Sequence, residues 1–278
     1  MPPVVAVSLA RVRATTLVVV VAALVADAWL GLFPGPYIVS WLFGMALIFA
    51  LLRAGTLART PVELRPPVAG RWQAQNSPAT RVPSHGIQSY GQAYAIDLVA
   101  DPADGSRPRF AWWPPARRPD EFPGFGAPVY APCDGTVVRI HDRQRDHYSR
   151  TSPLGIGFLF TVEVLRELFG PNRILGNHVV IGRDDGTYVA LAHLRRSSGR
   201  VRRGDRVASG DHIAACGNSG NSTEPHLHLQ AMDHARPVLA AGVPFRLVAD
   251  DETPVPTPAN GAHLDAPAPS RPVRTTTT

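Results

Sequence analysis

Two long apolar runs near the N-terminus restrict most strongly what this chain can fold into. Residues 15–33 read "TTLVVVVAALVADAWLGLF" and residues 37–52 read "YIVSWLFGMALIFALL", with "PGP" between them. Each run is slightly short for a helix that crosses a bilayer core of about 30 Å. Together they predict a transmembrane helical hairpin that anchors the chain through residues 1–53.

An alternative interpretation takes residues 1–28 as a signal peptide. Arg11 and Arg13 would then form its charged start, and "ADA" at 26–28 its cleavage site. Asp27 is the one acidic residue within the apolar runs, and a lone carboxylate inside a membrane is costly. We therefore expect Asp27 to lie near the membrane interface, close to the "PGP" turn.

Arginines flank the hairpin at both ends. Arg11 and Arg13 precede it, and Arg53, Arg59 and Arg65 follow it. The positive-inside rule therefore predicts that both termini, and everything downstream of the hairpin, lie in the cytoplasm.

The rest of the chain divides by composition. Residues 54–84 are rich in Pro, Arg and small polar residues, which indicates a linker. Residues 85–248 contain short alternating runs bounded by Gly, Pro and Asp, which predict a β-rich domain. Two insertions interrupt it: a surface loop at 101–125, and a segment at 142–176 that contains an amphipathic helix. Residues 249–278 form a Pro/Thr-rich tail that we expect to be disordered.

Charge and cysteine content exclude some functions. The 28 Lys+Arg residues against 22 Asp+Glu favour affinity for an anionic surface such as membrane lipid or cell-wall polymer, although many arginine-rich proteins are simply soluble. Basic runs interleaved with aromatic residues are missing, so we expect no nucleic-acid partner. Cys133 and Cys216 lack C-x-x-C spacing, which leaves two buried thiols or one disulfide.

Four polar residues stand on otherwise apolar predicted strands. Asp97 lies in "AYAIDLVA", His193 ends "TYVALAHL" on the face of Val189 and Leu191, and His226 and His228 share one face of "PHLHLQ". No H-E-x-x-H motif is present, so a helix-borne metalloprotease site is excluded. Two histidines and a carboxylate around an open fourth position are instead a known set of ligands for catalytic zinc.

These motifs resemble those of the lysostaphin/LytM-type zinc metalloendopeptidases. The resemblance rests on "GNSGNS" before "PHLH", on "AHL", on an upstream His…Asp pair, and on three further segments in the same order, "GAPVYAPCDGTVV" (126–138), "GNHVVI" (176–181) and "VRRGDRVASGDHIAACGNSGNS" (201–222). It covers roughly residues 85–235 and implies a mainly β fold, in which an antiparallel sheet forms a groove with the metal on its floor.

The resemblance also implies a function and a role for each residue. The chain would be a hydrolase that cleaves peptide bonds in peptidoglycan stem or cross-bridge peptides with a zinc-activated water. Asp97 and His228 would bind Zn²⁺, and His193 and His226 would form the catalytic pair that does not bind the metal. The family spaces its first ligand as H-x-x-x-D, but Ala93 stands at that position, so we assign the role to His85, twelve residues before Asp97. A longer loop can still close on a metal, because loop-closure entropy grows slowly with length.

An alternative function is a catalytically inactive cell-wall-binding or regulatory module of the same fold. Degenerate members usually lose ligands, whereas a full set can be assigned here, so an enzyme is favoured. A biotinyl or lipoyl carrier module is weaker still, because "GDRVASGD" offers no lysine to modify. The peptidoglycan substrate predicts a membrane protein with an extracytoplasmic domain, which is the opposite of the orientation that the arginines predict.

Overall fold

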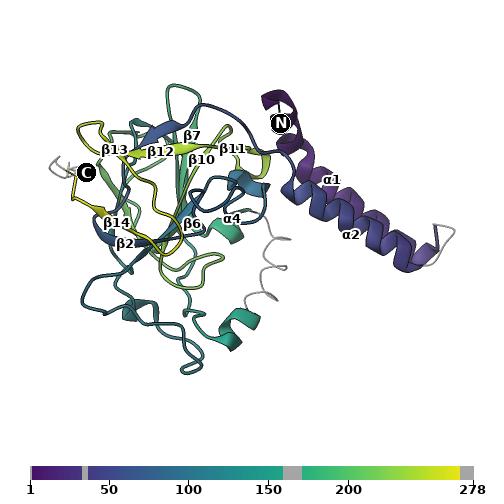
Figure 1. Ribbon diagram of the computed structural model, residues 1–278, viewed down its shortest axis with the longest axis horizontal. Coiled ribbons are helices and arrows are strands. Elements are labelled where there is room, and N and C mark those ends of the chain that lie inside the picture. Colours follow the sequence, from purple (N-terminus) through teal and green to yellow (C-terminus); the bar gives the residue numbers. More distant parts are fainter. Residues whose placement is uncertain (1, 33–36, 159–170, 270–278) are drawn as a thin grey trace.

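A nine-stranded antiparallel sheet is the centre of the structure (Figure 1). The computed structural model describes residues 2–32, 37–158 and 171–269. The strands pair in the following order, with β11 (Gly242–Val243) added beside β10: β14 (His263–Ala266), β2 (Gly70–Gln75), β3 (Ile96–Ala100), β10 (Leu227–Met232), β7 (Tyr188–Leu194), β6 (Asn177–Gly182), β5 (Gly135–His141) and β8 (Arg206–Val207). The prediction of a mainly β, antiparallel fold is confirmed.

Smaller elements surround this sheet. A three-stranded sheet is formed by β1 (Val62–Leu64), β12 (Phe245–Val248) and β13 (Pro254–Val255), and a two-stranded one by β4 (Pro128–Tyr130) and β9 (His212–Ala215). The helices and 3₁₀ turns that have assigned bounds are α1 (Pro3–Leu30), α2 (Tyr37–Arg53), η1 (Ser89–Gly91), η2 (Pro119–Glu121), α4 (Pro171–Leu175) and η3 (Pro237–Leu239).

The two faces of the central sheet differ in chemistry. On β10, Leu227 and Leu229 point into the main hydrophobic core, where both are fully buried. Burying a leucine side chain contributes roughly 1.5–3 kcal/mol, so this face supplies much of the driving force for folding. His228 and Gln230 alternate with the leucines and therefore point to the opposite face. That second face is covered by the segments that contain η1 and η3, and it holds the polar residues described below.

Regular structure extends beyond the segment 85–248 on both sides. The expected linker, 54–84, contains β1 and β2, and β2 pairs with β3 in the central sheet. The expected disordered tail, 249–278, contains β13 and β14, and β14 pairs with β2 at the edge of the sheet. The physical reason is burial: Trp72 on β2 and Leu264 on β14 form a cross-strand pair and are only 2% and 3% exposed. A Pro-rich composition predicts irregular structure, and these short strands are therefore missed from the sequence alone.

The two N-terminal helices pack side by side and project from the sheet domain (Figure 1). Close to the turn between them, the Ser40 hydroxyl donates a hydrogen bond to Asp27 Oδ2 over 2.7 Å, so the lone carboxylate has a partner within the pair. At the other end, Arg11 forms an ion pair with Asp233 and donates to the Leu239 carbonyl, which ties α1 to the sheet domain. By length and composition α1 could cross a membrane, whereas α2, with 17 residues, is a shorter apolar helix.

The insertion at 142–176 is described only in part. Residues 153–158 are helical, and α4 (Pro171–Leu175) leads directly into β6. Residues 159–170, which carry most of the predicted amphipathic helix, lie outside the described residues. The insertion at 101–125 is a loop that contains the short 3₁₀ turn η2.

Both cysteines are free and buried. Burial raises the pKa of the Cys133 thiol to about 11, and it raises the pKa of Cys216 further still. Because the reactive form of cysteine is the thiolate, both side chains act as small apolar core residues at neutral pH.

Candidate metal centre

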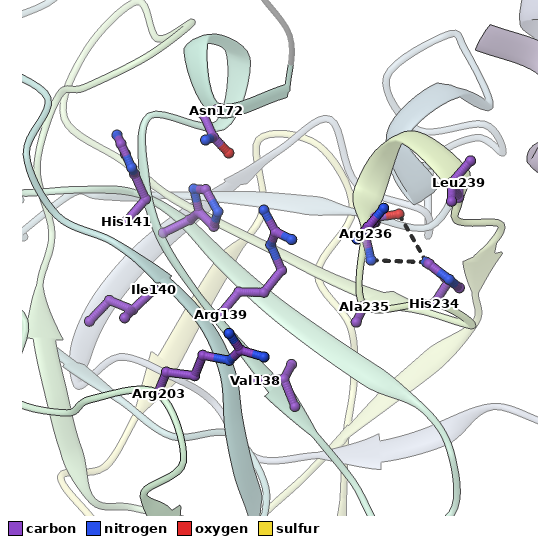
Figure 2. A pocket seen from close by; sticks show the side chains of 11 residues that line it. Val138, Arg139, Ile140, His141, Asn172, Arg203, His234, Ala235, Arg236 and Leu239 are labelled. Carbon is purple, nitrogen blue, oxygen red and sulfur yellow. Dashed lines mark hydrogen bonds between the residues drawn. The ribbon is translucent and has the colours of Figure 1, made fainter. Parts of the chain in front are cut away.

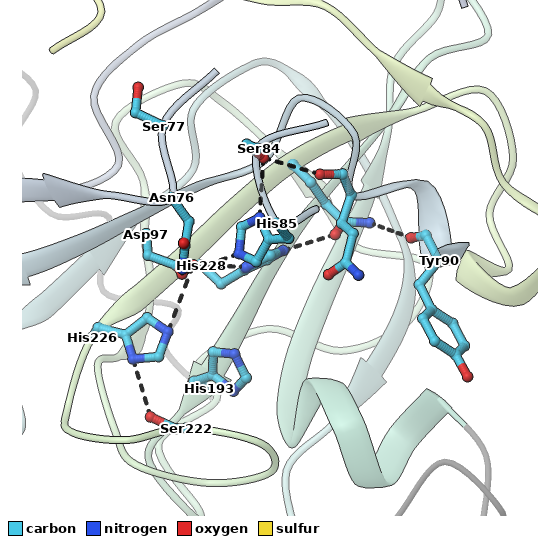
Figure 3. A network of polar contacts seen from close by, with 12 residues as sticks. Asn76, Ser77, Ser84, His85, Tyr90, Asp97, His193, Ser222, His226 and His228 are labelled. Carbon is cyan, nitrogen blue, oxygen red and sulfur yellow. Dashed lines mark hydrogen bonds and ion pairs between the residues drawn. The ribbon is translucent and has the colours of Figure 1, made fainter. Parts of the chain in front are cut away.

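Asp97 is the centre of a polar cluster on the second face of the sheet (Figure 3). It lies on β3, opposite His228 of β10 on one side and Gln75 of β2 on the other. Its side chain is buried, with the residue only 7% exposed. One carboxylate oxygen, Oδ2, accepts a hydrogen bond from the Asn76 side chain at 2.8 Å. An ionised carboxylate in such a position needs compensating charge or hydrogen bonds.

His85 reaches Asp97 from a loop. Its Nε2 lies 3.0 Å from Asp97 Oδ2. The loop closes at its base, where the Ser84 N–H donates to the Ala93 carbonyl over 2.8 Å and thus joins the two ends of the segment between the histidine and β3. The Ser84 hydroxyl donates to the Gln92 carbonyl, so its oxygen is left to accept from Nδ1–H of His85 at 3.0 Å. The proton of His85 is therefore assigned to Nδ1, and Nε2 presents a lone pair to Asp97.

His228 presents a lone pair to the same carboxylate. Gln230 lies on the same strand face, and its amide nitrogen donates to the Tyr90 carbonyl over 2.8 Å. The Gln230 oxygen therefore faces His228 Nε2, 2.7 Å away, and accepts its proton. In the neutral imidazole this arrangement leaves His228 Nδ1 without a proton, 2.8 Å from Asp97 Oδ1.

The three donor atoms fit a bound cation. Two imidazole lone pairs that face carboxylate oxygens at 2.8 and 3.0 Å repel them unless a proton or a metal ion lies between. The ligand atoms of His85, Asp97 and His228 lie within 4.8 Å of one another. Tetrahedral bonds of about 2.0–2.2 Å to zinc place ligand atoms about 3.3–3.6 Å apart, so a small inward shift of these side chains brings all three onto one ion. Within the ranges that the structure describes, no arginine or lysine contacts Asp97. The residues present therefore fit a divalent metal with nitrogen and oxygen ligands.

His193 reaches the cluster because its strand is irregular. Regular alternation would place it on the core face with Leu191, away from His228, and that is the face which the sequence predicts. In the structure β7 carries two residues, Ala192 and His193, opposite the single residue His178 of β6, which is a β-bulge. His193 also has a left-handed backbone, with φ of 60°. The bulge turns the side chain to the other face, and the predicted face is thus wrong for this residue.

His193 and His226, which lie outside the proposed set of metal ligands, are each held by a backbone carbonyl. Nδ1–H of His193 donates to the Ser219 carbonyl over 2.8 Å, and Nδ1–H of His226 donates to the Glu224 carbonyl over 2.8 Å. Their ring centres are 4.6 Å apart. Nε2 of His226 lies 3.6 Å from Asp97 Oδ1. With Nδ1 occupied by a backbone carbonyl, each ring has Nε2 available for proton transfer.

Burial and charge shift three pKa values in the cluster. Burial alone would raise the pKa of Asp97, but the nearby histidines His85 and His226 and the hydrogen bonds of the carboxylate hold it well below its usual range. Burial and the neighbouring His226 and His228 lower the pKa of His193 well below its ordinary value. Burial alone would lower the pKa of His228, but Asp97 raises it. The site therefore combines a carboxylate that stays ionised with a His193 that stays neutral.

All five residues predicted from the sequence line one cavity of about 230 Å³: His85, Asp97, His193, His226 and His228. Sequence reasoning missed the residues that orient them. Gln230 could have been found, because it follows His228 by two positions on the same strand face and is a polar residue on an apolar strand. Ser84 and Asn76 carry no such signal, since they precede or follow regular structure in turns.

Comparison with protein-family models matches one part of the chain to a peptidase family. The model of peptidase family M23 matches residues 162–240, a range that includes His193, His226 and His228 but not His85 or Asp97. This part of the chain resembles the M23 peptidases. The resemblance inferred from the sequence motifs is thereby confirmed, and three of the five clustered residues lie within the matched range.

One curated relative and several solved structures are similar. The peptidoglycan DD-endopeptidase ShyA of Vibrio cholerae is 39% identical over 123 residues, which are 44% of this chain and 21% of ShyA, so the chain spans about a fifth of that protein. The catalytic domain of lysostaphin from Staphylococcus simulans is 21% identical, with a TM-score of 0.32 over 56% of this chain and 76% of that one. A zinc-containing peptidase from Vibrio cholerae is 22% identical, with a TM-score of 0.30 over 69% and 40%.

The left-handed backbone of His193 predicts an unusual pattern of stability. Glycine adopts this conformation freely, whereas other residues pay roughly 1–2 kcal/mol for it. We therefore expect His193→Gly to be more stable than His193→Ala by about 1 kcal/mol in the free energy of unfolding. The measurement is chemical denaturation of the full chain in detergent.

The matched control is His226, which does not have a positive φ. There the order is expected to reverse, with His226→Ala more stable than His226→Gly by about 0.5–1 kcal/mol. If the Ala variant were more stable than the Gly variant at both positions, β7 would be regular at His193 and the bulge would be contradicted.

Proposed function

We propose that the chain is a zinc metalloendopeptidase that hydrolyses peptide bonds in peptidoglycan stem or cross-bridge peptides. In this proposal His85 Nε2, Asp97 and His228 Nδ1 bind the zinc ion, and His193 and His226 act as the catalytic pair. The observation that carries the proposal is the pair of lone pairs aimed at Asp97, each fixed by a second hydrogen bond on the other ring nitrogen. When bound, zinc supplies a Lewis acid that lowers the pKa of water and polarises a carbonyl group.

The two remaining histidines supply proton transfer. His193 is neutral because burial lowers its pKa, so its Nε2 can accept a proton from a water molecule in the cavity. The Ser219 carbonyl holds the opposite nitrogen of this ring and keeps Nε2 directed to the site. His226 is held by the Glu224 carbonyl through Nδ1–H, and in its doubly protonated form it is placed to donate from Nε2 to the oxygen that becomes negative when the peptide carbonyl is attacked.

A polymeric peptide has room at this site. A second cavity of about 630 Å³ lies beside the cavity at Asp97, and Asn76 and Thr223 line both. A chain that places its scissile bond near Asp97 can therefore continue into the neighbouring cavity. The similarity to a peptidoglycan DD-endopeptidase favours peptidoglycan peptides as this polymer.

The competing function is a catalytically inactive binding or regulatory module of the same fold. Such a module has no need for a complete set of ligands and bases. Here all five side chains converge on one cavity, and a carbonyl or side-chain oxygen orients each of the four histidines. This complete set favours the enzyme.

The roles of the histidines predict different effects of substitution. We expect His228→Ala to abolish stoichiometric zinc binding, because it removes one of three ligands. His193→Ala should keep the zinc and lower the rate of hydrolysis by about 10²–10⁴-fold, the usual contribution of a general base. Zinc content is measured by elemental analysis, and hydrolysis by the release of peptides from purified peptidoglycan. Stoichiometric zinc in His228→Ala would contradict the assignment, and full hydrolysis by His193→Ala would contradict its role as the base.

We further propose that α1 and α2 anchor the protein in a membrane and that the sheet domain lies outside the cytoplasm, where peptidoglycan is found. Two of the arginines that favour the opposite orientation have structural partners. Arg11 pairs with Asp233, and Arg13 donates to the carbonyls of Leu51 and Ala54. Both residues thus join the hairpin to itself and to the domain, a role that does not depend on membrane orientation.

The buried cysteines allow a direct test of this orientation. Ser106 is exposed in the loop 101–125, so Ser106→Cys adds the only accessible thiol among the described residues. A maleimide that cannot cross the cytoplasmic membrane should label Ser106→Cys in intact cells and leave the unsubstituted protein unlabelled. Labelling that appears only after lysis would place the domain in the cytoplasm and contradict the proposed localisation.

A further inference from the structure

A separate cavity of about 670 Å³ shares none of its described lining residues with the cavity at Asp97. We call it the arginine pocket. Residues of β5 line one side of this pocket, and the turn that leads into η3 lines the other side (Figure 2). Its lining residues include Arg139, Arg203 and Arg236, together with three histidines, His141, His178 and His234.

The pocket carries positive charge. Among the residues that the structure describes, no aspartate or glutamate lines it. Over the described ranges, the guanidinium groups of Arg139, Arg203 and Arg236 form no ion pair, in contrast to Arg206 nearby on β8, which pairs with Asp184. Arg203 and Arg236 are exposed, but Nε of Arg139 is buried and has no hydrogen-bond partner among the described residues. Leaving a charged donor buried and unbonded is costly, so this atom points to a missing acceptor.

Two of the three histidines, His141 and His178, are uncharged at neutral pH. The rings of His141 and His178 stack with their centres 5.9 Å apart. Burial lowers the pKa of His178 to about 4, and burial also lowers the pKa of His141. At neutral pH both rings are therefore uncharged, and the positive charge of the pocket comes from its arginines.

We propose that the arginine pocket binds a phosphoryl group. Guanidinium groups bind phosphate oxygens through paired, charge-assisted hydrogen bonds, and three of them match the charge of a phosphate better than that of a single carboxylate. A volume of about 670 Å³ accommodates both the phosphoryl group and the molecule that carries it.

The position of the pocket favours a membrane phospholipid as the source of this group. Leu239 lines the pocket, and its carbonyl accepts a hydrogen bond from Arg11 at the base of α1. If α1 and α2 are embedded as proposed, this contact places one wall of the pocket next to the membrane-anchoring helices. A soluble phosphate compound has the same chemistry and is the other source that the experiment separates.

The test is titration calorimetry of the metal-free full chain in detergent, so that no phosphate can bind to a metal. The probes are dihexanoyl phosphatidylglycerol below its micelle concentration and inorganic phosphate. Binding of the lipid at least tenfold tighter than phosphate would identify the headgroup as the source, and equal or tighter binding of phosphate would identify a soluble ligand. Both results support a phosphoryl site, whereas no binding of either probe would overturn it.

Substitutions locate the binding. Arg203→Gln and Arg236→Gln change exposed side chains and should each weaken binding about tenfold, as expected for one hydrogen bond to a charged group. Arg139→Gln should weaken it at least as much. The matched control, Arg206→Gln, removes an exposed arginine outside the pocket and should leave the affinity unchanged. Equal losses in Arg203→Gln and Arg206→Gln would show a general charge effect and overturn the proposal.

Discussion

The buried carboxylate of Asp97 is the constraint on which the site depends. It lies on a central strand of the sheet, where an ionised group is stable only with close compensating partners. Imidazole nitrogens approach both of its oxygens, and each approaching ring has its other nitrogen bound elsewhere. A positive ion between these groups satisfies all of them at once. The donor set and its spacing therefore support a zinc site more directly than a count of nearby histidines does.

The fold separates stability from chemistry by using the two faces of one sheet. Leucine side chains of β10 fill the core on one face, and the alternate positions of the same strand carry His228 and Gln230 on the other. The bulge in β7 moves one further histidine, His193, from the first face to the second. The strained backbone at this residue is thus explained by what it brings to the site.

Much of the site could be predicted from sequence because strand alternation is regular. Asp97, His226 and His228 are polar residues on predicted apolar strands, and they lie where alternation places them. The sequence also indicates His193, but the predicted face is wrong, because no local pattern marks a bulge. His85 is assigned only because the resemblance calls for an upstream histidine and His85 is the nearest one to Asp97. The hydrogen bond from the Ser84 N–H to the Ala93 carbonyl, which closes its loop, leaves no mark in the sequence. Strands β2 and β14 were missed because they lie in Pro-rich segments and owe their order to the burial of Trp72 and Leu264.

The central claim is that His85 completes the metal site despite its distance from Asp97 in the sequence. The most direct measurement is the zinc affinity of His85→Ala, determined by competition with a chelator, beside His178→Ala as a control for loss of a buried histidine elsewhere in the sheet. The account predicts that His85→Ala fails to retain stoichiometric zinc, while His178→Ala binds zinc as the unsubstituted protein does. Zinc affinity in His85→Ala equal to that of the unsubstituted protein would contradict it.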